Sequence, residues 1–213
     1  MKSKNQILVY ETVPLSNFLI ANGFSGTETM RICKCAEYSA DCMEKAGKKY
    51  DGKPYVVHLV TVFLTALNYL QLLKHLDREE QVSVLCAAFT HDLLEDTTQT
   101  LSQIMKVCDT PTCMLCSMIT NLLTAEKKET HEATMNESYY DQVKEIDAAV
   151  FLKLCDRLAN VSWRGPKSME KREMYKKEYK HFKKAFGKYT EFKPILTQIY
   201  KELYQPIFIR TYK

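Results

Sequence analysis

The chain has 213 residues, of which 46% are hydrophobic and 26% charged, with a formal net charge of +4. This length suits one domain with a sizeable core. The small net charge gives no support to nucleic-acid binding, and no continuous run of 18 or more apolar residues predicts a membrane span. We therefore expect neither nucleic acid nor membrane as a partner.

Eight cysteines are present, and several, such as Cys86 and Cys155, lie within apolar helical runs. We interpret them as reduced thiols of a cytoplasmic protein, since the N-terminus also lacks the pattern of a signal peptide. Cys113 and Cys116 have a spacing that zinc sites use. Met114 and Leu115 between them favour a buried helix instead, with a zinc site as the weaker alternative.

Strand-like alternation is almost absent and glycine and proline number only six each, so we expect an all-α fold of about eight to ten helices without a significant sheet. Residues 1–25 are mixed, with room for a short helix packed on the body. A first clear helix runs from about Thr27 to Ala46, and Gly47 suits the position just past its end. Residues 47–53 form a charged loop before a second helix, from about Pro54 to Lys74.

The spacing of Asp77 and Glu80 is that of a capping box and opens a helix ending near Leu94. Thr100 caps a short helix to about residue 107, and Pro111 starts another to about residue 123. Residues 125–134 are polar and expected to be mobile. Further helices are predicted over about 136–143, 146–160, 168–186 and 192–204.

The stretch His91-Asp92-Leu93-Leu94-Glu95-Asp96 carries the strongest chemical signal in the chain. It follows an apolar run, residues 82–89, that predicts a buried helix. Charged groups at the end of a buried helix need compensation, and a metal ion is a common source. On a helix Glu95 lies one turn beyond His91, and Asp96 one turn beyond Asp92, so the four groups share one neighbourhood. The alternative is a capping cluster that opens a new helix.

Two distant segments supply further ligands. The segment Gly52-Lys53-Pro54-Tyr55-Val56-Val57-His58 places a histidine on the first turn of a helix begun by proline. Residues 151–160 insert charged groups, among them Asp156, into another apolar helix. The ordered set His58, His91, Asp92 and Asp156 supplies two imidazoles and two carboxylates. Such a mixed nitrogen and oxygen shell suits manganese, iron or magnesium more than a structural zinc site.

Four blocks in this order resemble the HD superfamily of metal-dependent phosphohydrolases, and within it the RelA/SpoT-type hydrolase domain in its small stand-alone, metazoan SpoT homologue-like form. The blocks are Gly52 to His58, His91 to Thr98, Leu123 to Lys127 and Lys153 to Asn160. They lie within a core of about residues 37–163. The resemblance implies a single HD-type helical bundle over residues 1–213, completed by C-terminal helices in residues 167–213.

The resemblance also implies a function. The domain would be a manganese-dependent hydrolase of guanosine 3′,5′-bis(diphosphate) and its pentaphosphate, (p)ppGpp, releasing pyrophosphate from the ribose 3′ position to give GDP or GTP. One Mn²⁺ ion would be held by His58, His91, Asp92 and Asp156. The catalytic residues would be Glu95 and Asp96, which position the attacking water and handle its proton. Nucleotide and phosphate contacts are implied at Lys49, Tyr55, Thr124, Lys127, Arg157 and Asn160.

About fifty residues follow Asn160, too few for an additional nucleotide-transferring domain with its own sheet, so we expect degradation of the alarmone and not its synthesis. The expected partner is a small-molecule nucleotide substrate, and a homo-oligomer is left open. The residues from Lys167 to Lys188 hold nine Lys or Arg against three Glu, with aromatic residues at helical spacing. This pattern favours an aromatic core face and a solvated lysine face, with steering of a polyanionic nucleotide as a minor role.

Several positions depart from the family pattern. Leu59 replaces a proline, Ala159 a histidine or tyrosine, and Ser162 an arginine, while Lys49 replaces an arginine that would stack better on a base. None is a predicted metal ligand, so we still expect hydrolysis. The first alternative is an HD phosphohydrolase acting on another nucleotide: NADPH 2′-phosphate, a dNTP or a nucleoside monophosphate. A non-catalytic nucleotide sensor is the second, and the complete metal shell and acidic pair argue against it.

Overall fold

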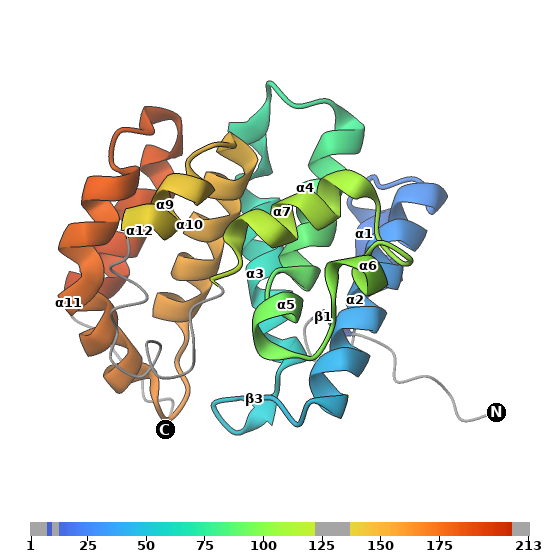
Figure 1. Ribbon diagram of the computed structural model, residues 1–213, viewed down its shortest axis with the longest axis horizontal. Coiled ribbons are helices and arrows are strands. Elements are labelled where there is room, and N and C mark those ends of the chain that lie inside the picture. Colours follow the sequence, from blue (N-terminus) through green and yellow to red (C-terminus); the bar gives the residue numbers. More distant parts are fainter. Residues whose placement is uncertain (1–7, 10–12, 122–136, 206–213) are drawn as a thin grey trace.

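The computed structural model describes residues 8–9, 13–121 and 137–205. Within these residues the chain is a bundle of helices with two very short hairpins, and the all-α prediction is confirmed (Figure 1). The first hairpin pairs β1 (Leu8–Val9) with β2 (Val13–Pro14), and the second pairs β3 (Lys49–Tyr50) with β4 (Lys53–Pro54). The helices of the first part of the chain are α1 (Leu15–Ala21), α2 (Gly26–Lys45), α3 (Val56–Tyr69), η1 (Leu70–Leu73) and α4 (Arg78–Thr90).

The remaining helices follow α4 in the chain. They are α5 (Leu93–Asp96), α6 (Leu101–Ile104), α7 (Thr110–Ile119), α9 (Glu137–Val143), α10 (Asp147–Ser162), α11 (Ser168–Phe186), η3 (Thr190–Phe192) and α12 (Lys193–Tyr204). The predicted bounds of the C-terminal helices agree with these to within two residues. The predicted polar segment at 125–134 lies outside the described residues.

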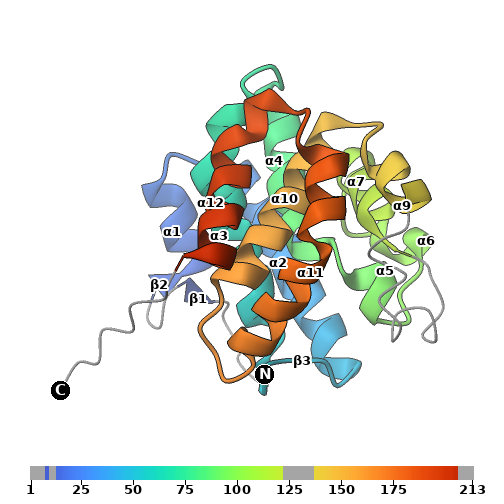
Figure 2. The ribbon, with the colours of Figure 1, turned by 90° about the vertical axis from the view of Figure 1, so that its left-hand side faces the viewer.

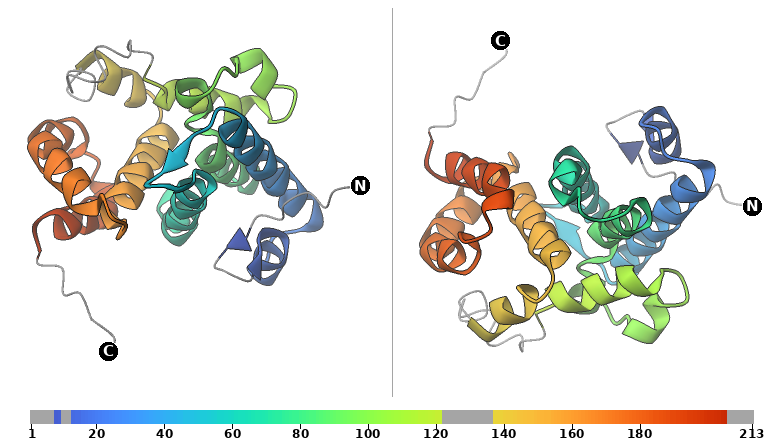
Figure 3. Two further views of the ribbon diagram at one scale, coloured as in Figure 1. Left: turned by 90° about the horizontal axis from the view of Figure 1, so that it is seen from below. Right: turned by 90° about the horizontal axis from the view of Figure 1, so that it is seen from above.

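Helices α3, α4 and α10 form the centre of the bundle. Helix α2 packs on α4 at one side, and α10 separates α3 from the α11–α12 pair at the other (Figures 1 and 3). Figure 2 shows α11 and α12 side by side on the outside of α10. Stacked rings of Phe63 and Phe89, 4.9 Å apart, join α3 to α4, and Phe151 of α10 packs on Phe192.

The segment Val56–Leu73, which consists of α3 and η1, is long and apolar enough to cross a membrane by length and composition. The expectation drawn from continuous apolar runs missed it, because polar residues such as His58, Thr61 and Thr65 interrupt the run. In the helix the Thr61 and Thr65 hydroxyls donate to carbonyls one turn earlier. This helix contacts α4 and α10 and places His58 in the interior. Such contacts are those of a core helix, so the segment is weak support for a membrane span.

The predicted helix ends near the site are set by local hydrogen bonds. Asp77 and Glu80 form the predicted capping box at the start of α4, and Thr100 caps α6. Gly47 follows the last residues of α2 with a φ of 69°, the left-handed conformation expected of a glycine at this position. These signals depend on neighbours in sequence, and the sequence therefore places them correctly.

The loop predicted over residues 47–53 is in part a hairpin. Strands β3 and β4 are joined by Asp51 and Gly52, which have φ values of 53° and 80°. Asp-Gly is a preferred sequence for a two-residue hairpin turn with both central residues at positive φ. The strands are only two residues long, too short for alternation to reveal them.

The helix predicted to run to Leu94 ends instead at Thr90, and α5 begins after it. Side chains take the carbonyls of the last turn: His91 Nδ1 lies 2.9 Å from the Ala88 oxygen, and Cys116 Sγ donates to the Thr90 oxygen at 3.0 Å. Asp92 then has φ −94° and ψ 0°, outside ideal helical geometry. The interruption lies at the predicted metal ligands.

Candidate active site

Three ligand-type side chains meet at one end of the central helices. His58 lies on the first turn of α3, and His91 and Asp92 form the link between α4 and α5. One ligand atom of each lies within 4.8 Å of those of the other two. Asp92 Oδ2 is 2.9 Å from His91 Nε2 and 3.5 Å from His58 Nε2.

Asp156 reaches the same point from α10. Its Oδ1 lies 3.4 Å from His58 Nε2 and 3.9 Å from His91 Nε2. The structure therefore brings together all four side chains that the sequence predicted as metal ligands, from segments almost one hundred residues apart. Both histidines are buried, and the two carboxylates are mostly enclosed.

The hydrogen bonds of His91 fix which ring nitrogen faces the cluster. A backbone carbonyl can only accept, so Nδ1 carries the proton that it donates to Ala88, and Nε2 is the ring nitrogen that faces the cluster. Nε2 is buried and makes no hydrogen bond, although Asp92 Oδ2 is close by. A buried ring nitrogen that makes no hydrogen bond and faces two carboxylates and a second imidazole fits a site for a bound cation.

The charged groups of the cluster shift one another's pKa values. Burial alone would lower the pKa of His91, but the Asp92 and Asp156 carboxylates raise it to about 9. Burial opposes ionisation of Asp92 and Asp156 too, yet the histidines, and Lys153 beside Asp156, hold the pKa of both carboxyls below the ordinary value. The ionised form of the two enclosed carboxylates is thus stabilised by nearby positive charge. A divalent ion can supply this charge in place of the histidine protons.

The acidic pair predicted to be catalytic lies next to the cluster on α5. Asp96 Oδ1 is 2.8 Å from Lys48 Nζ, and its Oδ2 is 3.1 Å from the Tyr55 hydroxyl. Glu95 is half-buried, and its Oε2 accepts a hydrogen bond from the Asn121 amide at 3.3 Å. Both carboxylates were predicted to act on the attacking water and not as metal ligands, and this assignment stays a prediction.

Asn160 and Lys153 orient the Asp156 carboxylate. Asn160 Nδ2 donates to Asp156 Oδ1 at 2.7 Å, and Lys153 Nζ lies 3.2 Å from Oδ2. The Asn160 amide oxygen in turn accepts from the Tyr50 hydroxyl at 3.0 Å. The predicted substrate residue Asn160 therefore contacts a metal ligand in this structure, one turn away on the same helix.

Tyr50 covers His58. Its ring stacks on the imidazole with centroids 4.6 Å apart, and Trp163 packs edge-on against Tyr50 at 5.1 Å. Sequence reasoning missed Tyr50, Lys48 and Lys153 as site residues. The Asp-Gly turn was a usable signal for Tyr50, because that hairpin positions the residues directly before the Pro54 motif.

The other predicted substrate residues have different positions. Lys49 is exposed on β3, while Tyr55 contacts Asp92 and Asp96. Arg157 is buried and forms an ion pair with Glu178 at 2.8 Å, with its guanidinium 4.0 Å from the Tyr175 ring centroid. These contacts direct Arg157 toward α11, and its substrate role stays a prediction. Thr124 and Lys127 lie outside the described residues.

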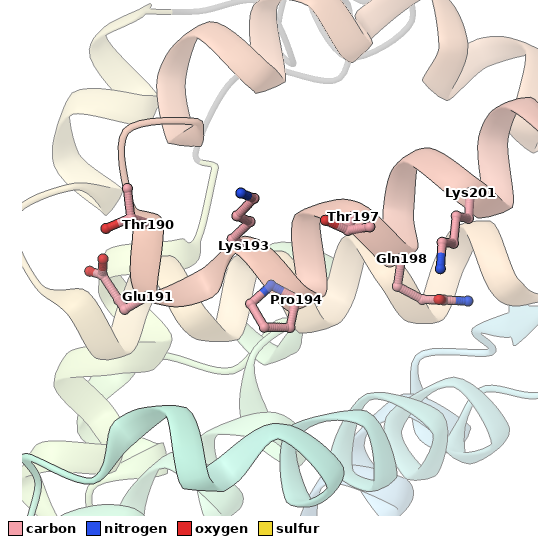
Figure 4. A pocket seen from close by; sticks show the side chains of 7 residues that line it. All are labelled: Thr190, Glu191, Lys193, Pro194, Thr197, Gln198 and Lys201. Atoms are coloured by element: carbon pink, nitrogen blue, oxygen red, sulfur yellow. The ribbon is translucent and has the colours of Figure 1, made fainter.

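An open depression of about 620 Å³ lies elsewhere, on η3 and α12 (Figure 4). It is bounded by Thr190, Pro194 and Lys201. None of the residues that line it belongs to the cluster of histidines and carboxylates. The chemistry of the ligand set, and not this hollow, therefore locates the candidate active site.

No protein-family model matches the chain. The probable guanosine-3′,5′-bis(diphosphate) 3′-pyrophosphohydrolase of Mycoplasma genitalium is 26% identical to it over an alignment of 168 residues, with 75% of this chain and 22% of that protein covered. The chain thus spans about a fifth of the length of this curated relative. A solved structure of a metazoan ortholog of SpoT, described as hydrolysing ppGpp and acting in starvation responses, aligns with a TM-score of 0.56 at 21% identity, covering 81% of this chain and 94% of that one.

The chain resembles SpoT-type proteins in sequence and in fold. The resemblance predicted from the four sequence blocks is therefore confirmed. The structural likeness shows a shared helical fold, and the sequence likeness extends over three quarters of the chain.

Proposed function

We propose that the chain is a metal-dependent hydrolase of (p)ppGpp, which removes pyrophosphate from the ribose 3′ position to give GDP or GTP. The observation that carries this proposal is the meeting of His58, His91, Asp92 and Asp156 beside the acidic pair Glu95 and Asp96. The name of the curated relative and the description of the structural neighbour support the choice of nucleotide. We place the activity in the cytoplasm, where the cysteines would stay reduced.

The four residues of the cluster would hold one divalent ion. Two imidazole nitrogens and two carboxylate oxygens suit Mn²⁺, which we propose as the metal. When bound, such an ion lowers the pKa of a water molecule and withdraws charge from a phosphate oxygen. The hydrogen bond from His91 Nδ1 to the Ala88 carbonyl and the one from Asn160 to Asp156 hold two of the ligands in orientation.

Glu95 and Asp96 would orient the attacking water and accept its proton. Asp96 is held by Lys48 and Tyr55, so its position beside Asp92 is defined on two sides. The water oxygen forms a bond to the phosphorus attached to the ribose 3′ oxygen, and the bond between that phosphorus and the 3′ oxygen breaks. The 3′ oxygen leaves and takes up the proton that the acidic pair accepted from the water, and pyrophosphate is released intact.

The test is turnover of a nucleotide panel by the purified protein with Mn²⁺, read by product chromatography. We expect ppGpp to give GDP and pyrophosphate, with no orthophosphate appearing first, and pppGpp to give GTP. GTP and GDP should survive, because they carry no 3′ phosphate. Consumption of NADPH, a dNTP or a nucleoside monophosphate while ppGpp stays intact would overturn the proposal in favour of another nucleotide.

A further inference from the structure

Asp51 connects the start of helix α11 to the β3–β4 hairpin, which lies beside the metal cluster. The carboxylate of Asp51, at the hairpin turn, accepts hydrogen bonds from Trp163 Nε1 at 2.7 Å and from the Lys167 amide at 3.2 Å. The first turns of α11 are therefore held against the same hairpin that places Tyr50 on His58. A side chain on this part of α11 has a defined position relative to the metal cluster.

Lys171 occupies that position. Its Nζ lies 3.6 Å from the centroid of the Tyr50 ring, and the negative face of an aromatic ring attracts such a cation. The Tyr50 ring is the one that stacks on His58, and its hydroxyl is the donor to Asn160. Lys171 is also close enough to Asp156 for their charges to interact.

Lys171 differs from three other cations around the site, each of which has a carboxylate partner. Lys48 forms an ion pair with Asp96, Lys153 with Asp156, and Arg157 with Glu178. In the described part of the chain Lys171 has no carboxylate within ion-pair distance. Partial burial lowers its pKa because the ammonium has lost some of its water, while the Asp51 and Asp156 carboxylates act in the opposite direction. An anion brought to this point would replace the missing partner.

We infer that Lys171 is a substrate-binding residue, which holds a phosphate oxygen of the nucleotide at the edge of the metal site. The inference rests on the proposed function, because a substrate with several phosphates is the anion that would reach the cluster. It also gives α11 a role beyond covering α10. The sequence favoured a solvated lysine face for this helix, and Lys171 departs from it because it lies over the Tyr50 ring.

The experiment compares Lys171→Met, Lys171→Arg and the wild type with Mn²⁺ and ppGpp. Methionine keeps the apolar stem against Tyr50 and removes the charge, whereas arginine keeps the charge. Lys180→Met, at an exposed position of the same helix, is the matched control. For each protein, turnover is measured over a range of salt concentrations, and equilibrium binding of ppGpp is measured by calorimetry at a temperature where turnover is slow.

We expect Lys171→Met to raise KM and the dissociation constant about ten- to a hundredfold, the usual effect of one lost charge-assisted hydrogen bond. The change in kcat should be smaller. Lys171→Arg should restore most of the affinity, and Lys180→Met should match the wild type. The salt dependence of KM should be weaker in Lys171→Met than in the wild type, because one screened charge pair is absent.

An unchanged KM and affinity in Lys171→Met would overturn the inference. So would a loss that arginine does not reverse and that leaves the salt dependence as it was, since a purely structural contact behaves in that way. Wild-type protein that binds ppGpp without hydrolysing it would overturn the proposed activity, and the binding series would still decide the role of Lys171. Wild-type protein that does not bind ppGpp would overturn both.

Discussion

The hydroxyl of Tyr55 lies 2.7 Å from Oδ2 of Asp92, and the same hydroxyl is 3.1 Å from Oδ2 of Asp96. Burial and the Asp92 charge raise the pKa of Tyr55 well above its ordinary value, so the hydroxyl keeps its proton and donates it. Tyr55 thus forms hydrogen bonds to both a predicted metal ligand and a predicted catalytic carboxylate. The resemblance implied a nucleotide contact at this residue, and the structure adds a positioning role to that expectation.

Tyr55→Phe removes this donor while keeping the ring that packs beside His58. We expect metal affinity or activity to fall by roughly 10- to 100-fold, the usual cost of losing a hydrogen bond to a metal ligand. The measurement is Mn²⁺ titration followed by ppGpp turnover at saturating metal. Tyr38→Phe, which loses a hydroxyl bonded to Gln99 outside the cluster, is the control. Equal values for Tyr55→Phe and the wild type would contradict the positioning role.

Asp156→Ala tests the metal site itself. The carboxylate of Asp156 comes from α10, and its removal leaves His58 and His91 facing Asp92 alone. We expect loss of bound metal and of activity, with helical content by circular dichroism nearly unchanged. Metal content is read by atomic emission after gel filtration. If the variant retains metal at the wild-type ratio, Asp156 is not a ligand.

Glu95→Gln separates metal binding from proton handling. The amide keeps the shape of the side chain and its contact near Asn121 but cannot accept a proton from water. We expect the variant to retain the metal and to lose roughly 10²–10⁴ in rate, the range for a general acid or base. Metal content and single-turnover rate are measured on the same preparation. Parallel loss of both would show that Glu95 is a ligand.

The sequence predicted the helices well because their signals are local. Asp77 with Glu80, Thr100 and Gly47 each act within a few residues of their own position, where spacing is visible in the sequence. The break after Thr90 was not predicted, because it depends on Cys116 and on the turn of the His91 side chain toward Ala88. Such contacts are fixed by tertiary packing.

The same distinction holds for the site. The motif order identified the four side chains that converge, since ligand chemistry restricts which residues can serve. It did not distinguish Lys48, which pairs with Asp96, from its exposed neighbour Lys49. Nor did it reveal that Lys171, more than one hundred residues from Tyr50, lies over that ring. Direction of a side chain on a short strand or an outer helix depends on partners that are distant in sequence.

Arg157 gives a test that distinguishes structure from substrate binding. Its buried ion pair with Glu178 suggests a stabilising contact between α10 and α11, and Arg157→Met would leave the Glu178 charge without that partner. We expect the free energy of unfolding to fall by about 3–5 kcal/mol, measured by urea denaturation. The double variant Arg157→Met with Glu178→Leu should recover most of the loss. Unchanged stability combined with a raised KM would support the substrate contact instead.

Glu28 links pH to stability at the start of α2. Its carboxylate accepts hydrogen bonds from Arg78 Nε at 2.5 Å and from the Ser25 amide at 2.6 Å, completing a capping box. The Arg78 hydrogen bond, with that of Ser25, lowers the pKa of Glu28 from 4.5 to about 2. Because the folded pKa is the lower one, the folded state is favoured by the ionised form. This stabilisation is complete above about pH 4.5 and is lost as the pH falls toward about 2.

Glu28→Gln should therefore lower the free energy of unfolding at pH 7 by roughly 1–3 kcal/mol, the range for a cap and a charged hydrogen bond. The difference from the wild type should shrink as the pH falls from about 4.5 and vanish near about 2, where the wild-type carboxylate becomes protonated. Urea denaturation at a series of pH values measures both quantities. Glu37→Gln, at an exposed position of the same helix, should follow the wild type at every pH. A difference between Glu28→Gln and the wild type that stays constant from pH 7 to about 2 would show that the cap acts through the shape of the side chain and not through its charge.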